Sequence, residues 1–79
     1  MISLKDILTD LAKAIVDNPD KVVVNEDVDS EGNVLLILTV APEDMGMVIG
    51  RHGKIAKAIR TVMKAAANTI KTKVTVEIK

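Results

Sequence analysis

Near the start of the chain, apolar residues recur at every third or fourth position and predict an amphipathic helix over about residues 4–17. The apolar positions are Leu4, Ile7, Leu8, Leu11 and Ile15. Ser3 precedes them and can cap the helix, with Asp6 three residues further on as in a variant of the capping box. The helix should end at Asn18-Pro19, because the residue before a proline is disfavoured in the α conformation.

The next pattern is typical of a β-hairpin. Lys21–Val28 contains three successive valines and predicts a strand, and the residues of 29–33 favour a turn. A second strand is predicted over Val34–Val40, which is almost wholly apolar. Because this apolar run is continuous and does not alternate, the second strand should be central, with helices covering at least one of its faces.

Two helices and one more strand follow. Ala41–Asp44 should open a short helix that continues to Ile49, since proline suits a first turn and carboxylates favour the positive end of a helix. A loop over Gly50–Gly53 then separates it from a second helix over about residues 54–69. Lys73–Lys79 alternates strictly between apolar and polar residues, as a half-buried strand does.

The resulting order, α-β-β-α-α-β, predicts an α+β fold with a three-stranded mixed sheet packed against three helices. The two-helix crossover before the last strand is long enough to bring that strand parallel to the preceding one. A chain of 79 residues has room for one hydrophobic core, so we expect a single domain over residues 1–79.

The composition excludes several classes of protein. The chain has no Cys, which rules out disulfides and thiolate zinc sites. It also has no Phe, Tyr or Trp, so it cannot stack bases on aromatic side chains as RRM and OB modules do. The first twenty residues carry four aspartates and do not look like a signal peptide, and no segment is apolar enough to span a bilayer. We therefore expect a cytoplasmic protein without a membrane partner.

Charge is distributed very unevenly along the chain. The formal net charge is zero, but residues 1–44 hold three basic and ten acidic side chains, and residues 45–79 hold eight basic and one acidic. No carboxylate side chain lies between Met45 and Val76. Such a chain can present a local positive surface and repel polyanions elsewhere.

The basic half contains a candidate phosphate site at Gly50-Arg51-His52-Gly53. Glycines permit a sharp turn with exposed backbone N–H groups, next to the positive N-terminus of the following helix. The cations of that helix fall within about a third of its circumference; they are Lys54, Lys57, Arg60 and Lys64. An aliphatic groove for a few unstacked bases is expected beside the loop, lined by Ile49, Ile55 and Ile59 with Val40 or Leu38.

The element order and the segment Val48–Lys54 resemble the KH domain in its type II arrangement. A longer pattern resembles the KhpA family of small bacterial single-KH RNA-binding proteins. It comprises Ala41–Gly46, Gly50–Gly53, Ala58–Val62 and Lys64–Ala67. In one departure, Ala56 stands where many KH domains carry a bulky aliphatic residue, which implies a shallower or rotated groove floor.

The resemblance implies non-catalytic binding of about four nucleotides of single-stranded RNA, by a post-transcriptional regulator or RNA chaperone. It also implies self-association and a KhpB-like KH protein as a further partner. In this interpretation Arg51, His52 and Lys54 position phosphates, and Lys57 and Arg60 extend the positive field along the RNA strand. The predicted RNA-binding residues are Ile49, Gly50, Arg51, His52, Gly53, Lys54, Ile55, Lys57 and Arg60.

Other interpretations remain open. A single G-x-x-G is common in tight turns, and a charged stripe is often only a solvated helix face. The domain can also be mainly an oligomerisation or adaptor module that acts through protein contacts. An enzyme is the least supported class, because the chain has one His, no Cys and no set of residues that would activate a nucleophile. We expect no metal and no cofactor.

Overall fold

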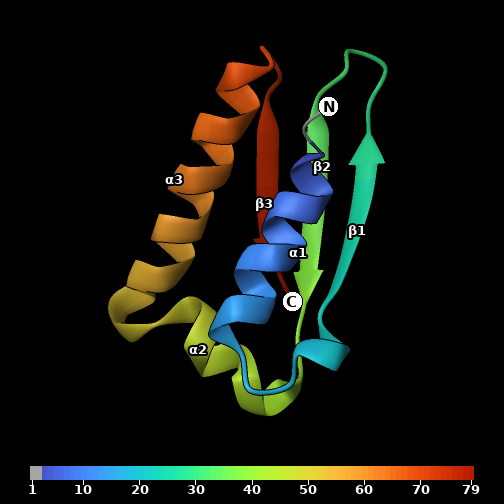
Figure 1. Cartoon of the computed structure of the whole chain (residues 1–79). Coiled ribbons are helices and arrows are strands. Elements are labelled where there is room, and N and C mark those ends of the chain that lie inside the picture. Colours follow the sequence, from blue (N-terminus) through green and yellow to red (C-terminus); the bar gives the residue numbers. More distant parts are fainter. Residues whose placement is uncertain (1–2) are drawn as a thin grey trace.

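The computed structural model describes residues 3–79 and contains the predicted order of helices and strands (Figure 1). The main elements are α1 (Leu4–Ile15), β1 (Val23–Val28), β2 (Val34–Thr39), α2 (Met45–Ile49), α3 (Lys54–Thr69) and β3 (Val74–Ile78). Single 3₁₀ turns cover Pro19–Lys21, Pro42–Asp44 and Arg51–Gly53. The α+β fold class predicted from the sequence is therefore confirmed.

The strands form one mixed sheet in the order β1-β2-β3. β1 runs antiparallel to β2, and β3 returns through the α2–α3 crossover to run parallel to β2. β2 is thus the central strand, as its continuous apolar sequence predicted. The pairing places Leu38 opposite Val24 on one side and Leu36 opposite Val76 on the other, so that buried side chains share one face.

α1 and α3 lie side by side over that face of the sheet (Figure 1). α2 sits at one end of the molecule and contacts both of these helices. The core between the layers is entirely aliphatic, in keeping with a sequence that has no aromatic residue. Its largest fully buried apolar side chains are Leu8, Leu36, Leu38, Val48 and Met63. No helix within residues 3–79 has the length and apolar character needed to cross a membrane.

α1 begins as predicted but ends earlier. The Ser3 hydroxyl accepts a hydrogen bond from the Asp6 backbone N–H at 3.3 Å, which confirms the cap. The helix ends at Ile15, two residues before the predicted Asp17, because Val16 adopts an extended conformation (φ −88°, ψ 160°). This conformation buries the Val16 side chain in the core, so tertiary packing ends the helix before proline does.

The hairpin turn is held by the carboxylate of Asp29. This group accepts hydrogen bonds at 2.9 Å from the backbone N–H groups of Glu31 and Asn33, and at 3.0 Å from the Asn33 amide. These bonds favour the ionised form, and the Asn33 backbone N–H contributes most to lowering the pKa of Asp29 below its ordinary value. The turn predicted over residues 29–33 is thus confirmed, with an Asx-type interaction as its cause.

Candidate nucleic-acid interface

The Gly50–Gly53 loop joins α2 to α3 at the end of the molecule away from the β1–β2 hairpin turn (Figure 1). The side chains of Arg51 and His52 are exposed, and so is that of Lys54 at the start of α3. The loop is therefore an accessible surface feature and is not a turn buried beneath other parts of the molecule.

Both glycines of the loop adopt backbone conformations that other residues avoid. Gly50 has φ +74° and ψ 175°, a region that is essentially restricted to glycine. A Cβ at Gly50 would also collide with the side chain of Ile55 and would lie 2.9 Å from the Ile55 backbone nitrogen. Gly53 is left-handed (φ +74°, ψ 15°), but a Cβ there would meet open space. Gly50 is thus required by conformation and by packing, and Gly53 by conformation alone.

His52 is left-handed as well, with φ +56° and ψ 25°. His is among the residues that tolerate this conformation better than most. Within residues 3–79, no backbone or side-chain acceptor is found for the backbone N–H groups of Arg51 and His52. Gly53 provides no side-chain cap for the first turn of α3. The loop therefore offers unused N–H donors beside a positive helix end, which is an arrangement suited to an anion.

The predicted cations of α3 all lie at its surface. Lys57 and Arg60 follow Lys54 along one flank of the helix and are exposed. In the described part of the chain, the only side-chain ion pair within 4.0 Å joins Lys79 and Glu77, at 3.9 Å. The α3 cations are thus not neutralised by carboxylates of the same chain, and their charge is available to a ligand.

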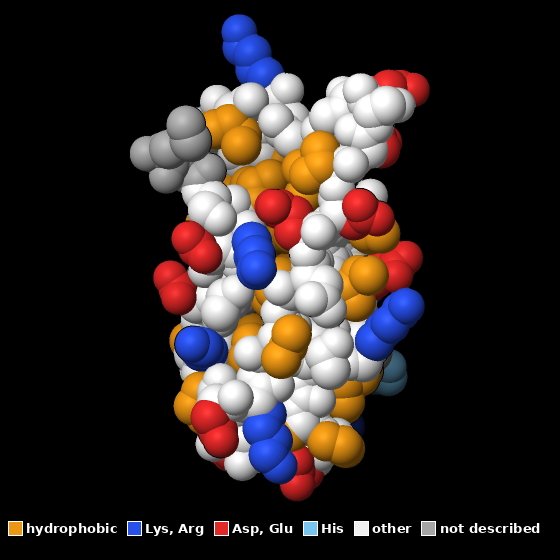
Figure 2. Space-filling view, turned by 90° about the vertical axis from the view of Figure 1, so that its right-hand side faces the viewer, with side chains coloured by type: hydrophobic (Ala, Val, Ile, Leu, Met, Phe, Trp, Pro, Cys, Tyr) orange, Lys and Arg blue, Asp and Glu red, His pale blue; other side chains and the backbone are white. Residues whose placement is uncertain are grey.

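The face of the molecule on the β1 side has a different character. Figure 2 shows acidic and basic side chains intermixed there, without a broad field of Lys and Arg. A polyanion would therefore be attracted to the loop and the α3 flank and not to this face.

Arg60 makes a contact that the sequence did not indicate. Its Nε donates a hydrogen bond to the Val76 carbonyl oxygen at 3.3 Å, which links α3 to the outer edge of β3. The rest of the guanidinium remains available, because Arg has five N–H donors in all. Arg60 therefore lies where the cationic flank of α3 meets an unpaired strand edge.

The groove predicted beside the loop is placed differently in the structure. Ile59, Leu38 and Val40 are buried in the core, so the prediction that they line a groove was wrong. β2 is central and its helix-facing side chains are covered, which leaves the edge strand β3 to form the accessible wall. Ile49 and Ile55 remain about 39% and 38% exposed next to the loop, as expected.

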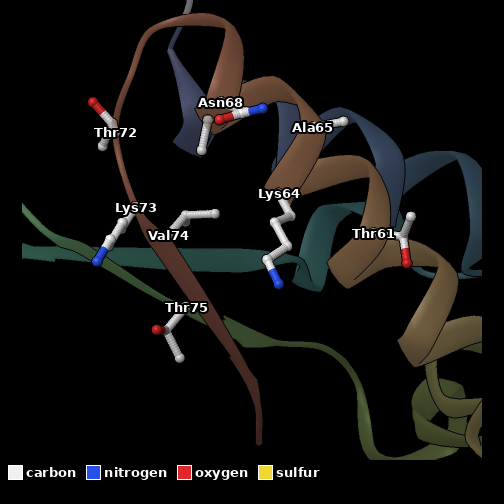
Figure 3. Close-up of a pocket in the computed structure, with 9 residues that line it drawn as sticks. Thr61, Lys64, Ala65, Asn68, Thr72, Lys73, Val74 and Thr75 are labelled. Atoms are coloured by element: carbon white, nitrogen blue, oxygen red, sulfur yellow. The ribbon is translucent and has the colours of Figure 1, made fainter.

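The accessible trough runs between α3 and β3. One hollow of about 210 Å³ is lined by Arg60, Lys64 and residues 74–76. A second hollow of about 620 Å³ lies further along α3; Figure 3 shows its wall, to which Thr61, Lys64, Asn68 and Lys73 contribute. The sequence did not indicate Thr61, Asn68 or Lys73 as lining residues, because nothing in the local pattern shows which helix flank faces which strand edge.

A buried carboxylate fixes the element that carries the loop. Asp44 is 1% exposed and its Oδ2 accepts from the Asn18 backbone N–H at 3.0 Å and from the Asn18 side-chain amide at 3.1 Å. Glu43 and Asp44 were interpreted as helix-start chemistry, yet Asp44 makes no side-chain cap to α2. Instead it ties the segment after α1 to the start of α2.

Two apolar side chains of α2 and two of α3 are exposed. Met47, Ile49, Ile55 and Val62 are between 38% and 46% exposed. Ile55 and Val62 are seven residues apart and share one side of α3, about 200° around the helix from Lys57 and Lys64. α3 therefore carries two distinct surfaces, one cationic and one aliphatic.

Comparison with known proteins places this geometry in a family. The family model described as "KhpA/KhpB, KH domain" matches residues 5–78. RNA-binding protein KhpA of Clostridium acetobutylicum is 56% identical over 75 residues, which cover 95% of this chain and 99% of that protein. RNA-binding protein KhpA of Aquifex aeolicus is 45% identical over 78 residues, covering 99% and 98% of the two chains.

The fold also occurs inside a larger protein. Era, in a complex with MgGDPNP and nucleotides 1506–1542 of 16S ribosomal RNA, matches 95% of this chain with a TM-score of 0.67 and 14% sequence identity. The match covers 28% of the Era chain, and it concerns the fold alone. The relatives are named as RNA-binding proteins, which describes binding and not catalysis, in agreement with the sequence interpretation. On the family match and these relatives, the chain belongs to the KhpA/KhpB KH-domain family.

Proposed function

We propose that this protein binds single-stranded RNA through the Gly50–Gly53 loop and the adjoining flank of α3, without catalysing a reaction. The observation that carries the proposal is the loop itself, whose unused N–H donors lie beside an uncapped helix start and exposed cations. The relatives named as RNA-binding proteins support the same ligand. The protein would act in the cytoplasm as a post-transcriptional regulator or RNA chaperone.

In this proposal the loop holds the RNA backbone. Gly50 and Gly53 let the chain approach a phosphate closely, while Arg51, His52 and Lys54 surround it with donors and positive charge. Lys57 and Arg60 continue the positive field along the strand, and the exposed side chains of Ile49 and Ile55 contact the sugar or base nearest the loop. No aromatic residue is present to stack bases, so backbone contacts and aliphatic surface must provide the affinity.

The number of nucleotides that the site contacts determines its affinity for RNA. KH domains hold about four nucleotides, and neutralising ~2–4 phosphates of a single strand gives a slope of log K against log salt of about −1.5 to −3. Such a contact is weak for one copy. Useful affinity would come from a second domain on the same RNA, in a dimer or with a KhpB-like KH protein.

A charge reversal in the loop tests the proposal. Replacing Arg51→Asp and His52→Asp should abolish binding of a short single-stranded RNA, because two negative charges would repel the phosphate at the point of closest approach. Asp tolerates the left-handed conformation at position 52, so the fold should be kept. Binding is measured by mobility shift at low salt and the fold by circular dichroism.

A matched control separates the effect of the loop residues on RNA binding from the effect of net charge. Lys5→Asp with Lys13→Asp makes a comparable change on exposed positions of α1 and should leave RNA binding within about twofold of wild type, because α1 lies outside the proposed site. If the loop variant bound RNA as well as this control did, the proposed site would be wrong.

A second candidate function, assembly through protein contacts, is favoured by the aliphatic flank of α2 and α3. Their exposed apolar side chains, which include Val62 at 46% exposure, are suited to a second copy or a KhpB-like partner. Val62→Glu should shift a dimer toward monomer in sedimentation velocity, and Ala14→Glu on α1 should not. A tight dimer indifferent to RNA and salt would favour the adaptor function over RNA binding.

A further inference from the structure

We propose that the larger hollow between α3 and β3 is a second nucleotide subsite, which binds the RNA strand beyond the loop and reads one base through Asn68. The inference rests on the proposed RNA-binding function. It adds to the loop a separate place, at the other end of α3, where base identity is recognised.

The hollow is large enough for a nucleotide and is continuous with the loop side of the molecule. Its volume is about 620 Å³, within the range of small-molecule sites. It shares Lys64, Val74 and Thr75 with the smaller hollow, whose wall includes Arg60. A strand leaving the loop past Arg60 would therefore enter it directly. From Lys54 to Asn68, α3 rises by about 21 Å, further than the loop itself can reach.

The charges at the hollow suit a nucleic-acid backbone. Lys64 from α3 and Lys73 from β3 are exposed, and Figure 3 shows them on either side of Val74. No acidic side chain is among the described residues that line the hollow, and neither lysine has a carboxylate within 4.0 Å. A backbone that passes between them can place one phosphate near each lysine.

Asn68 supplies hydrogen bonds that are not used within the protein. Its side-chain amide has no partner among the described residues, whereas the hydroxyls of Thr61 and Thr72 bond to nearby backbone carbonyls. One acceptor and two donors on a single amide can pair with two atoms on the edge of a base. Ala65 and Val74 give the hollow an apolar wall against which the face of that base can lie.

The first test compares RNA length. Wild type should bind an eight-nucleotide single-stranded RNA at least about tenfold more tightly than a four-nucleotide RNA, with a steeper salt dependence. Lys64→Gln with Lys73→Gln should remove most of this gain, keep binding of the four-nucleotide RNA, and reduce the salt slope for the longer RNA by about 1 to 1.5. Lys5→Gln with Lys13→Gln on α1 is the matched control and should keep the gain.

The second test concerns base identity. Eight-nucleotide RNAs that differ at one position should show a preference of about tenfold at the base held by Asn68. Asn68→Ala should abolish the base preference at this position alone and should leave the thermal unfolding temperature unchanged. A merely structural role of Asn68 would lower affinity for all the RNAs equally or lower stability, and either result would overturn the assignment.

The outcomes separate the two proposals. If wild type binds both lengths equally, or the lysine variant keeps the full gain, the second subsite is wrong while RNA binding by the loop stands. If the lysine variant loses both lengths equally, the lysines act at the loop site and the subsite is also wrong. If wild type binds neither RNA but does bind a basic or acidic peptide, both proposals fail.

Discussion

Gly50 and Gly53 occupy equivalent places in the loop motif but differ in what a side chain would meet. Gly53→Ala should lower the free energy of unfolding by about 1 kcal/mol, because only the left-handed conformation is disfavoured. Gly50→Ala should cost about 2–4 kcal/mol, since the new methyl group also collides with Ile55. Urea unfolding of the two variants measures the difference.

The order of the two effects is the informative result. If Gly53→Ala destabilised the protein as much as Gly50→Ala does, the contact between Gly50 and Ile55 would not be the reason for glycine at position 50. Ile55→Ala with Gly50→Ala should recover only part of the loss, because the Ile55 backbone nitrogen remains 2.9 Å from the new Cβ.

The sequence predicted the loop but not the trough. Gly50–Gly53 is recognisable because its glycines and flanking cations are adjacent in the chain. The bond from Arg60 to Val76 spans sixteen residues and depends on how α3 lies against β3. The predicted groove used Ile59 and Leu38, whose apolar character is equally typical of the core where they are found.

The bond between Asp44 and Asn18 connects two elements and positions the helix that carries the loop. Asp44→Ala should lower the free energy of unfolding by about 1–3 kcal/mol, because it leaves the two Asn18 donors without their acceptor. Glu43→Ala, at an exposed neighbouring position, should change it by less than about 0.5 kcal/mol. Chemical denaturation of both variants provides the comparison.

A stability loss of the same size in both variants would contradict this role. It would indicate that the two acids act only through the positive end of the following helix, as the sequence interpretation had it. A loss of stability in the Asp44→Ala variant alone would instead support a specific connection between α1 and α2.

Helices and strands were most predictable from the sequence where the apolar periodicity was long. α3 has the predicted bounds because sixteen residues carry an unbroken helical pattern between glycine and a left-handed Lys71. The strands begin and end within one or two residues of the prediction. The end of α1 was less predictable, since Val16 leaves the helix to enter the core and the chain gives no local stop signal before Asn18.

The fold converts an uneven charge distribution along the chain into distinct surfaces. The acidic half builds α1 and the hairpin, and the loop and α3 come from the stretch between Met45 and Val76, which has no carboxylate side chain. Net charge is therefore a poor guide to the partner of this protein. The sequence showed the division of charge, but only the packed arrangement shows that β3 and the cationic flank of α3 border one trough.

The salt dependence of RNA binding, compared between wild type and the Arg51→Asp, His52→Asp variant, is a direct test of RNA binding through the loop. We expect wild type to bind a short single-stranded RNA with a slope of log K against log salt of about −1.5 to −3, and the variant to show no specific binding. A slope near zero for wild type, or the same slope and affinity for both proteins, would contradict RNA binding through this loop.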